Sequence, residues 1–301
     1  MADLLRLAVF TLCTWIYTIH QDPSYVTFAE LLNDDNGTDT PQFSTVSSSS
    51  IVFGPYDNTT KLGTEDPRIA YDHKTGTYHM FYTCYGSKGA TLCLATSKNP
   101  TDKSSWKIVG DLGFGGGSKS GALLLQDEAP HYLYWGAGTI RVTSSTDLNK
   151  WTPGTAFING TLWGNRKVES GPPPMILSTG DYVFFHNSWP QGWEAPAGHL
   201  RTGAYEPAWV ILNGSDPTQI IARAPVPLWS PSLEPWMCGD APYYCNAPKV
   251  AFLEAAHPTG KVDEFRVYVG GADMVTGSAV VKMSKIDGVQ CNGTMPNITY
   301  H

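Results

Sequence analysis

The sequence predicts an all-β protein, specifically a five-bladed β-propeller, from its composition and from a strand pattern that recurs five times. Glycine and proline punctuate the chain, with 30 and 22 copies in 301 residues, and only 16% of the residues are charged. No long stretch places apolar residues at the three-to-four spacing of an amphipathic helix. The short apolar runs are instead rich in Tyr, Phe, Trp, Val and Thr, which suit a pleated, half-buried surface.

An aromatic, alternating strand is the repeated unit. Its five copies cover residues 14–20, 77–83, 131–137, 181–187 and 265–271. A second strand-like run follows each copy, at residues 26–32, 91–97, 139–145, 200–206 and 278–284. An apolar run precedes the last four copies, at residues 66–72, 121–126, 172–178 and 248–254, and residues 2–10 hold the corresponding place in the first. Five such units are typical of a propeller whose innermost strands are these preceding runs.

The repeats predict one propeller domain over residues 1–301. Its blades are expected at about residues 1–50, 62–110, 118–160, 166–225 and 244–290. A short sheet buries both faces only against its neighbours, so closing the ring removes exposed apolar faces and most open edges. Independent sandwich domains are the alternative, because the copies are degenerate and unevenly spaced.

The apolar N-terminus, residues 1–20, has two interpretations. A signal peptide needs a basic start and a small-residue cleavage site, whereas here Asp3 is set against Arg6 and no clear site follows. We therefore favour the first blade over a leader. The run is also too short and too rich in threonine for a membrane span, so none is predicted.

Six cysteines and six Asn-x-Ser/Thr sequons predict a secreted, disulfide-bonded glycoprotein. The sequons lie at Asn36, Asn58, Asn159, Asn213, Asn292 and Asn297. Cys84 and Cys93 lie in neighbouring strand-like runs and could pair across a hairpin. Cys238 could close a short loop with Cys245, which leaves Cys13 and Cys291 near opposite chain ends. The alternative is a cytosolic protein with buried free thiols.

Charge and motif content narrow the partners. A net charge of -7 opposes a nucleic-acid partner, because such proteins need a basic surface. We find no His and Cys spacing of a metal site and no glycine-rich nucleotide loop, so no metal or organic cofactor is expected. Ten tryptophans suit stacking on sugar rings, although any single one is more often part of the core. The expected partner is an oligosaccharide or glycan.

Polar residues at the entrances of the innermost strands are the candidate site, because these entrances face a common axial pocket. The candidates are Glu65, Asp66, Arg68, Lys119, Arg166, Lys167, Glu169, Asn246 and Lys249, with His186 and Asp273 at strand ends and Arg201 before a second strand. Carboxylates interleaved with cations suit glycosidic-bond cleavage, in which an acid protonates the leaving oxygen while water or phosphate attacks from the opposite face. Asp66 stands out, since Glu-Asp-Pro-Arg after a glycine is an unusual way to build a simple turn.

Three ordered motifs are GTEDPRIAYDHKTGTYHMFYTCYG at residues 63–86, ESGPPPMILSTGDYVFFHNS at 169–188 and VYVGGADMVTGSAV at 267–280. Together they resemble the motifs of glycoside hydrolase family 130, the mannoside phosphorylases and β-1,2-mannosidases. The resemblance covers about residues 50–285. It implies a five-bladed propeller that cleaves β-mannosides with inversion of the anomeric centre.

The resemblance also implies roles for particular residues. Asp66 would be the general acid, acting through a sugar hydroxyl, and Asp273 would bond sugar hydroxyls. If inorganic phosphate is a co-substrate, its ligands by motif position are Arg68, Lys119, Lys167, His186 and Arg201. Arginine and lysine suit that task by charge and donor geometry. Glu65 and Asn246, at strand entrances, are expected to contact the sugar.

The sequence departs from the family pattern in the third blade. The usual Asp-Gly-Ala reads Ser120-Gly121-Ala122, and the usual His-Arg-Pro reads Trp135-Gly136-Ala137. The lost arginine removes an expected phosphate ligand, which favours hydrolysis. Glu169 and Glu206 are then candidates to activate water. The long segment at residues 188–206 carries Trp189 and Trp193 and is expected to act as a lid or a sugar platform.

Three functions remain open from sequence. The first is an inverting glycosidase or phosphorylase acting on β-mannosides. The second is a propeller glycosidase acting on arabinosides or xylosides. The third is a non-catalytic glycan-binding propeller, which the altered third blade favours and the intact run of residues 65–68 opposes.

Overall fold

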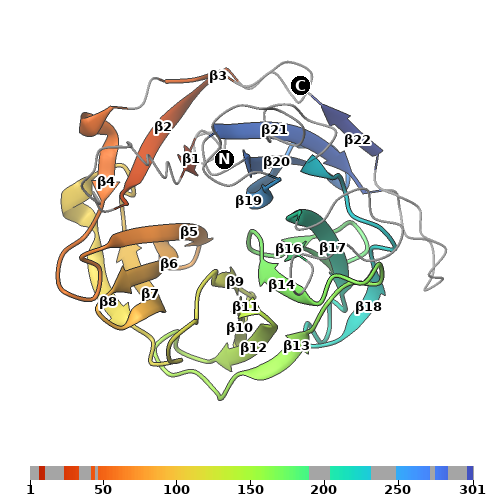
Figure 1. Cartoon of the computed structure of the whole chain (residues 1–301), viewed down its shortest axis with the longest axis horizontal. Coiled ribbons are helices and arrows are strands. Elements are labelled where there is room, and N and C mark those ends of the chain that lie inside the picture. The colour runs from red at the N-terminus through yellow and green to blue at the C-terminus, as the bar shows by residue number, and fades with distance from the viewer. Residues whose placement is uncertain are drawn as a thin grey trace.

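The computed structural model describes residues 7–10, 24–33, 42–44, 47–189, 204–231, 249–271, 275–283 and 297–300. These residues form five antiparallel sheets arranged as blades around a common centre (Figure 1). The predicted all-β propeller is confirmed. The helical content of the described residues is two 3-10 turns, Ser48–Ser50 and Lys103–Ser105. None of the helices in this part of the chain is long and apolar enough to cross a membrane.

The strands follow the chain blade by blade. The first blade holds β1 (Leu7–Phe10), β2 (Val26–Asn33), β3 (Gln42–Phe43) and β4 (Ile51–Phe53). The second holds β5 (Gly63–Asp72), β6 (Thr77–Gly86), β7 (Gly89–Ser97) and β8 (Lys107–Asp111). The third holds β9 (Ala122–Leu124), β10 (His131–Trp135), β12 (Ile140–Ser145) and β13 (Thr155–Ile158).

The fourth blade contains β11 (Ala137–Gly138), β14 (Lys167–Ser170), β15 (Met175–Ile176), β16 (Tyr182–Trp189), β17 (Glu206–Leu212) and β18 (Ile220–Arg223). The fifth contains β19 (Ala251–Pro258), β20 (Glu264–Gly271), β21 (Val275–Lys282) and β22 (Asn297–Tyr300). Figure 1 shows β5, β9, β14 and β19 nearest the centre of the ring. The entrances of these strands therefore converge as the repeats predict.

The repeated aromatic strand is the second strand of four blades, as β6, β10, β16 and β20. The copy at residues 14–20 lies outside the described residues. In that blade β1 pairs directly with β2, with Leu7 opposite Glu30 and Phe10 opposite Thr27. The expected order, with a further strand between the two, is therefore wrong for the first blade.

Two strand predictions in the fourth blade are also wrong. The partner of β16 is β17, and not the run at residues 200–206. Every residue of β17 is buried, so its sequence EPAWVIL lacks the alternation that marks a half-buried strand. The innermost strand, expected at residues 172–178, begins earlier as β14 and has only the two residues of β15 within that range, because Pro172, Pro173 and Pro174 lack the N–H groups of a continuous ladder.

Alternating side chains of the second strands join neighbouring blades. Met80 and Tyr82 of β6 pack in the cluster shared with the first blade, whereas Phe81 packs against the third. Phe184 of β16 faces the third blade and Phe185 faces the fifth. Burying one such ring contributes roughly 1.5–3 kcal/mol. A strand of a blade therefore stabilises two interfaces at once.

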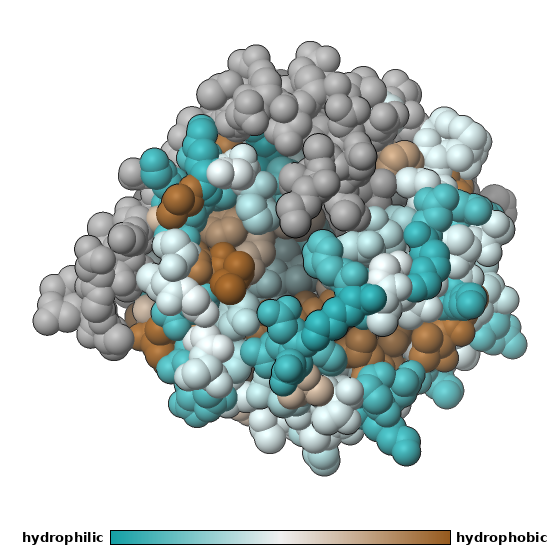
Figure 2. Space-filling model, turned by 180° about the vertical axis from the view of Figure 1, so that it is seen from behind, coloured by the Kyte–Doolittle hydropathy of each residue, from teal (hydrophilic) through white to brown (hydrophobic). Residues whose placement is uncertain are grey.

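The ring closes where the first and last blades meet. Figure 1 shows these two blades side by side. Phe43 of β3 contacts Tyr268 of β20, with ring centroids 5.9 Å apart in an edge-to-face arrangement. Figure 2 shows the back face, on which apolar side chains form separate patches between hydrophilic ones. Scattered apolar surface of this kind is normal for a soluble domain.

The predicted pairing of Cys84 with Cys93 is confirmed. The bridge joins β6 to β7 with Cα atoms 5.9 Å apart, and both cysteines are fully buried. Cys13, Cys238, Cys245 and Cys291 lie outside the described residues.

Candidate active site

Charged side chains from four blades meet at the centre of the ring. Lys119, just before β9, lies with its Nζ 3.5 Å from Asp66 Oδ2 and 3.0 Å from Glu169 Oε1. Arg68 Nη1 lies 3.2 Å from Glu254 Oε2. Four of these five residues were predicted site residues, and the structure brings them together. Glu254 is the addition.

Two of the carboxylates sit where the strand register breaks. On β5, Glu65 pairs with Thr83 and Arg68 with Phe81, so two residues, one of them Asp66, stand opposite a single residue of β6. On β19, Leu253 pairs with Val269 and Ala255 with Tyr268, which leaves Glu254 unpaired. Both are β-bulges, which free a side chain from strand alternation and are common beside active sites.

The backbone at three strand entrances is also in the left-handed region. Asp66 has φ 48°, Ser120 has φ 55° and Lys249 has φ 65°. Residues other than glycine rarely adopt such values, and each instance costs of order 1–3 kcal/mol. Strain of this kind persists only where surrounding contacts enforce it. The entrances of β5, β9 and β19 are therefore constrained at the same end of the ring.

Arg68 is held rigidly beneath the site. Its side chain is fully buried, and its Nη1 donates to the carbonyl of Asp66 at 2.6 Å. Its Nε and Nη2 donate to the carbonyls of Gly171 (3.2 Å) and Ser170 (3.1 Å). Glycine is required at 171, because a Cβ there would lie 2.7 Å from the carbonyl oxygen of Phe185.

Lys119 is the cation between the carboxylates. Attraction to Asp66 raises the pKa of Lys119, and it outweighs the opposing effect of burial, with Glu169 adding to the increase. Lys119 is therefore charged at every pH at which an enzyme works. Ser120 Oγ donates to Glu169 Oε1 at 2.5 Å, so this buried carboxylate oxygen receives two donors.

Asp66 and Glu254 have pKa values that move in opposite directions. Burial alone would raise the pKa of Asp66, but Lys119 and Arg68 outweigh it and lower that pKa. Burial raises the pKa of Glu254 to about 8, against the opposing charge of Arg68. Glu254 Oε2 makes no hydrogen bond to Arg68 despite its proximity, so the arginine stabilises the charged form weakly. At neutral pH the two carboxyl groups together hold one proton.

Glu254 and Glu169 differ in how far their side chains are exposed to solvent. The Glu254 side chain keeps 28% of its surface exposed, whereas the Glu169 side chain keeps 1%. Glu254 closes the run at residues 248–254 that the sequence identified as an innermost strand. Its role escaped sequence reasoning because a strand pattern does not reveal a bulge.

The other predicted site residues lie around this centre. Glu65 accepts from Ser24 Oγ at 3.3 Å. His186 is buried, and desolvation lowers its pKa to about 4, so it is neutral at neutral pH. Lys167 Nζ lies 5.8 Å from the ring centroid of Trp189. Arg166 is exposed.

Trp189 belongs to an aromatic series that leads towards Arg68. Trp189 stacks on Tyr205 at 4.6 Å, and Tyr205 lies 5.7 Å from Phe252. The Arg68 guanidinium lies 5.6 Å from the Phe252 ring centroid. Tyr205 and Phe252 extend the aromatic surface that the sequence predicted from Trp189.

Glu206, the other residue expected to activate water, is held by hydrogen bonds from neighbouring side chains. It is buried and accepts from Trp163 Nε1 and Asn165 Nδ2, both at 3.2 Å. Asn246, Asp273, Trp193 and Arg201 lie outside the described residues. Within the described ranges, no three His, Cys, Asp or Glu side chains are placed to hold a metal ion.

Comparisons with known proteins identify the family. A family model described as beta-1,4-mannooligosaccharide phosphorylase matches residues 7–289. The 1,2-beta-oligomannan phosphorylase of Thermoanaerobacter sp. (strain X514) is 30% identical over 231 residues, which cover 74% of this chain and 70% of that protein.

Solved structures share the fold. The beta-1,2-mannobiose phosphorylase of Listeria innocua superposes with a TM-score of 0.67 at 20% identity, covering 87% of this chain and 68% of that one. A second solved structure comes from work on glycoside hydrolases that target beta-1,2 mannosidic linkages in Candida mannan. It superposes with a TM-score of 0.66 at 23% identity, covering 91% of this chain and 83% of that one. At these identities the likeness shows the fold alone.

Proposed function

Because the chain belongs to glycoside hydrolase family 130, whose members cleave β-mannosidic bonds, we propose that it cleaves such bonds with water and with inversion. The observation that supports this proposal most directly is the pair of Asp66 and Glu254, two partly exposed carboxyl groups that hold one proton between them. Inverting hydrolysis needs one carboxylic acid and one carboxylate around the same bond. The pair supplies both.

The proton begins on Glu254 in the free enzyme. A sugar bound over Asp66 displaces the water that stabilises its carboxylate, whereas Arg68 remains beside Glu254. For Asp66 to act as the acid, substrate binding must move the shared proton from Glu254 to Asp66, and the loss of water around Asp66 acts in that direction. Asp66 then passes it through a sugar hydroxyl to the glycosidic oxygen, and the bond from that oxygen to the anomeric carbon breaks. Water attacks the opposite face of that carbon and gives a proton to Glu254, so the pair again holds one proton.

Phosphate is disfavoured because two of the predicted cations, Lys119 and Arg68, already have partners. Lys119 lies between Asp66 and Glu169, and Arg68 is occupied by three backbone carbonyls and by Glu254. A dianion would have to displace these groups while approaching three carboxyl groups. His186 is neutral and gives no compensating charge. The site favours a neutral nucleophile.

The aromatic series of Trp189, Tyr205 and Phe252 supports an extended sugar substrate. Flat rings cover the apolar faces of pyranose units, and the series runs from β16 to β19 beside Arg68. We assign it to sugar units beyond the one that is cleaved.

Secretion and glycosylation are part of the proposal. Asn58 and Asn159 are exposed, and the buried Cys84–Cys93 bridge is stable in an oxidising compartment. We propose that the enzyme acts in the secretory pathway or outside the cell. Its reaction uses carboxyl groups alone, without a cofactor.

The test is product analysis on β-1,2- and β-1,4-linked mannosides, with and without inorganic phosphate. We expect free mannose at equal rates in both cases, released first as the α-anomer in proton NMR. Mannose 1-phosphate formed only with phosphate would establish phosphorolysis and overturn the proposal. Measurable binding of mannosides with no product would instead indicate a non-catalytic propeller.

A further inference from the structure

Glu169 lies below the surface of the site. Its side chain is 1% exposed, and its Oε1 receives Lys119 Nζ at 3.0 Å and Ser120 Oγ at 2.5 Å. Its Oε2 is buried without a hydrogen-bond partner. A carboxylate placed in this way cannot touch a sugar, and its effect on the reaction must pass through Lys119.

The loop before Lys119 is rich in glycine. Residues 113–117 include three glycines with positive φ, and a Cβ at any of these would meet nothing within 4 Å. Backbone contacts hold the loop, since Gly117 N donates to the Ala90 carbonyl and Gly136 N donates to the Lys119 carbonyl, both at 2.8 Å. Ser120 has φ 55° and is fully buried, and the side-chain contact that enforces this strained backbone is its hydrogen bond to Glu169.

The same short segment positions the second cation of the site. Glu169 holds Lys119, while the carbonyls of Ser170 and Gly171 hold the Arg68 guanidinium. Glu169 itself is in regular register, opposite Ala137 on one side and Asn187 on the other. Residues 169–171 are therefore a rigid base beneath the strained bulges.

We propose that Glu169 is a positioning residue that, with Ser120, fixes Lys119 against Asp66 and thereby sets the pH range in which the Asp66 and Glu254 pair holds its single proton. The inference rests on the proposed function, because it concerns the same carboxyl pair. It separates Glu169 from water activation, the role expected from sequence.

The arrangement of charges around Lys119 predicts the direction in which each substitution moves the pKa of Glu254. The groups that face Lys119 are Asp66 and Arg68 from β5, Glu169 from β14, Tyr205 before β17 and Glu254 from β19. Negative charge on Glu169 raises the pKa of Glu254, and positive charge on Lys119 lowers it. Removing the charge of Glu169 must therefore lower the Glu254 pKa, whereas removing the charge of Lys119 must raise it.

The experiment compares Glu169→Gln with Lys119→Met in the full chain. Activity falls when the pair loses its proton, so the alkaline limb of kcat/KM follows that loss. We expect Glu169→Gln to lower this limb by roughly one pH unit and Lys119→Met to raise it by a similar amount. Glutamine keeps the shape of Glu169 and replaces an oxygen that makes no hydrogen bond, so the variant should fold.

Ser120→Ala is the matched control, because it removes the anchor and leaves every charge in place. We expect kcat to fall roughly tenfold and the alkaline limb to move less than in either charge variant, because Lys119 loses its anchor but keeps its charge. Wild-type kcat in Ser120→Ala, or limbs that move in the same direction in the two charge variants, would overturn the inference.

Infrared titration of the carboxyl groups separates this inference from the proposed function, because it needs no turnover. A wild-type protein without a carboxyl group that titrates near pH 8 would overturn the proton-sharing pair itself. A wild-type signal near pH 8 that stays in place in Glu169→Gln would overturn only the role of Glu169.

Discussion

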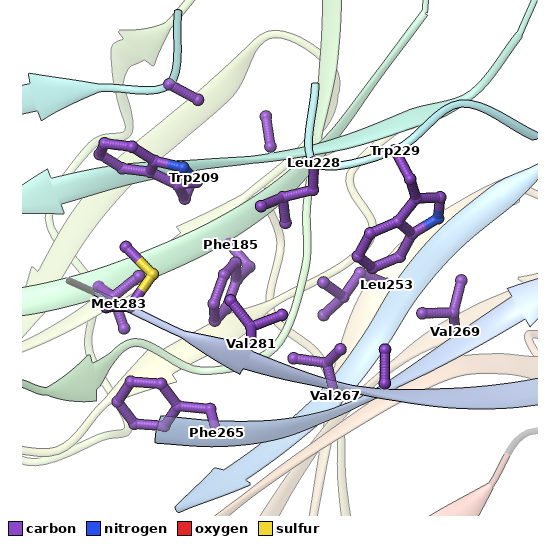
Figure 3. Close-up of a cluster of buried hydrophobic side chains, with 14 of the residues drawn as sticks. Phe185, Trp209, Leu228, Trp229, Leu253, Phe265, Val267, Val269, Val281 and Met283 are labelled. Carbon is purple, nitrogen blue, oxygen red and sulfur yellow. The ribbon is translucent and has the colours of Figure 1, made fainter. Parts of the chain in front are cut away.

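Two neighbouring residues of β19 belong to two contrasting regions of the molecule. Leu253 is fully buried in the apolar cluster between the fourth and fifth blades, beside Phe185 and Trp229 (Figure 3). Glu254 is the extra residue of a bulge and belongs to the charged axial cluster. The apolar region consists of closely packed buried side chains, whereas the axial region combines left-handed backbone with charged groups that are only partly matched. Adjacent residues of one strand therefore serve stability and function separately. The functional residue is the one at which the backbone departs from regular strand geometry.

The largest effect is expected from Asp66→Asn. The substitution keeps the size of the side chain and removes the proton donor, so kcat should fall by roughly 10³-fold. Mannoside binding and the thermal unfolding temperature should change little. Activity above a tenth of wild type, measured by mannose release, would sink the assignment.

Glu254→Gln should lower kcat by roughly 10²-fold, because water loses its proton acceptor. Added azide should partly restore turnover, since a small anion needs no base to attack the anomeric carbon. Rescue of Asp66→Asn by azide, without rescue of Glu254→Gln, would reverse the two roles.

The same Glu254→Gln variant should be more stable than wild type at alkaline pH. In the folded protein Glu254 stays protonated up to about pH 8, against an ordinary value of 4.5, so the folded state binds more protons between these limits. Wild-type stability is therefore full below about pH 4.5 and declines as the pH rises through 8. Glutamine mimics the neutral form at every pH. Urea unfolding should show no difference at pH 4 and a gain of up to about 5 kcal/mol at pH 9.

Leu253→Ala tests the other side of the comparison with a change at the adjacent residue. Truncation leaves a cavity in the apolar cluster and should reduce the free energy of unfolding by roughly 2–4 kcal/mol. The pH profile of the folded enzyme should match wild type, since Leu253 carries no charge. A shifted alkaline limb would show that the two regions are coupled through the bulge.

The smallest effect is expected from Cys84→Ala combined with Cys93→Ala. The bridge closes a short loop, with a sequence separation of 9, and its loss should cost roughly 2 kcal/mol by chain entropy. Neither cysteine belongs to the charged axial cluster, and kcat at 25 °C should be unchanged. A lower kcat in the folded double variant would contradict this separation.

Sequence reasoning identified much of the site and misjudged specific parts of it. Asp66, Arg68 and Lys119 were accessible to prediction because polar residues at the heads of apolar runs are conspicuous. Glu254 was missed, since it ends a run that otherwise looks like buried strand. Glu169 was correctly placed at the site, but its sequence position gives no indication that it lies beneath the surface. The second strand of the fourth blade was misplaced because a strand buried on both faces shows no alternation.

The sequence by itself determined the all-β class, the repeated unit, the Cys84–Cys93 bridge and the family, because these depend on local pattern and ordered motifs. Tertiary structure decided how charges from different blades combine. The pKa of Glu254, the partners of Lys119 and the burial of Glu169 all arise from groups more than 40 residues apart in the chain, held together by closure of the ring. Electrostatic interactions depend on distance and on access to water, and no single segment of the chain specifies either.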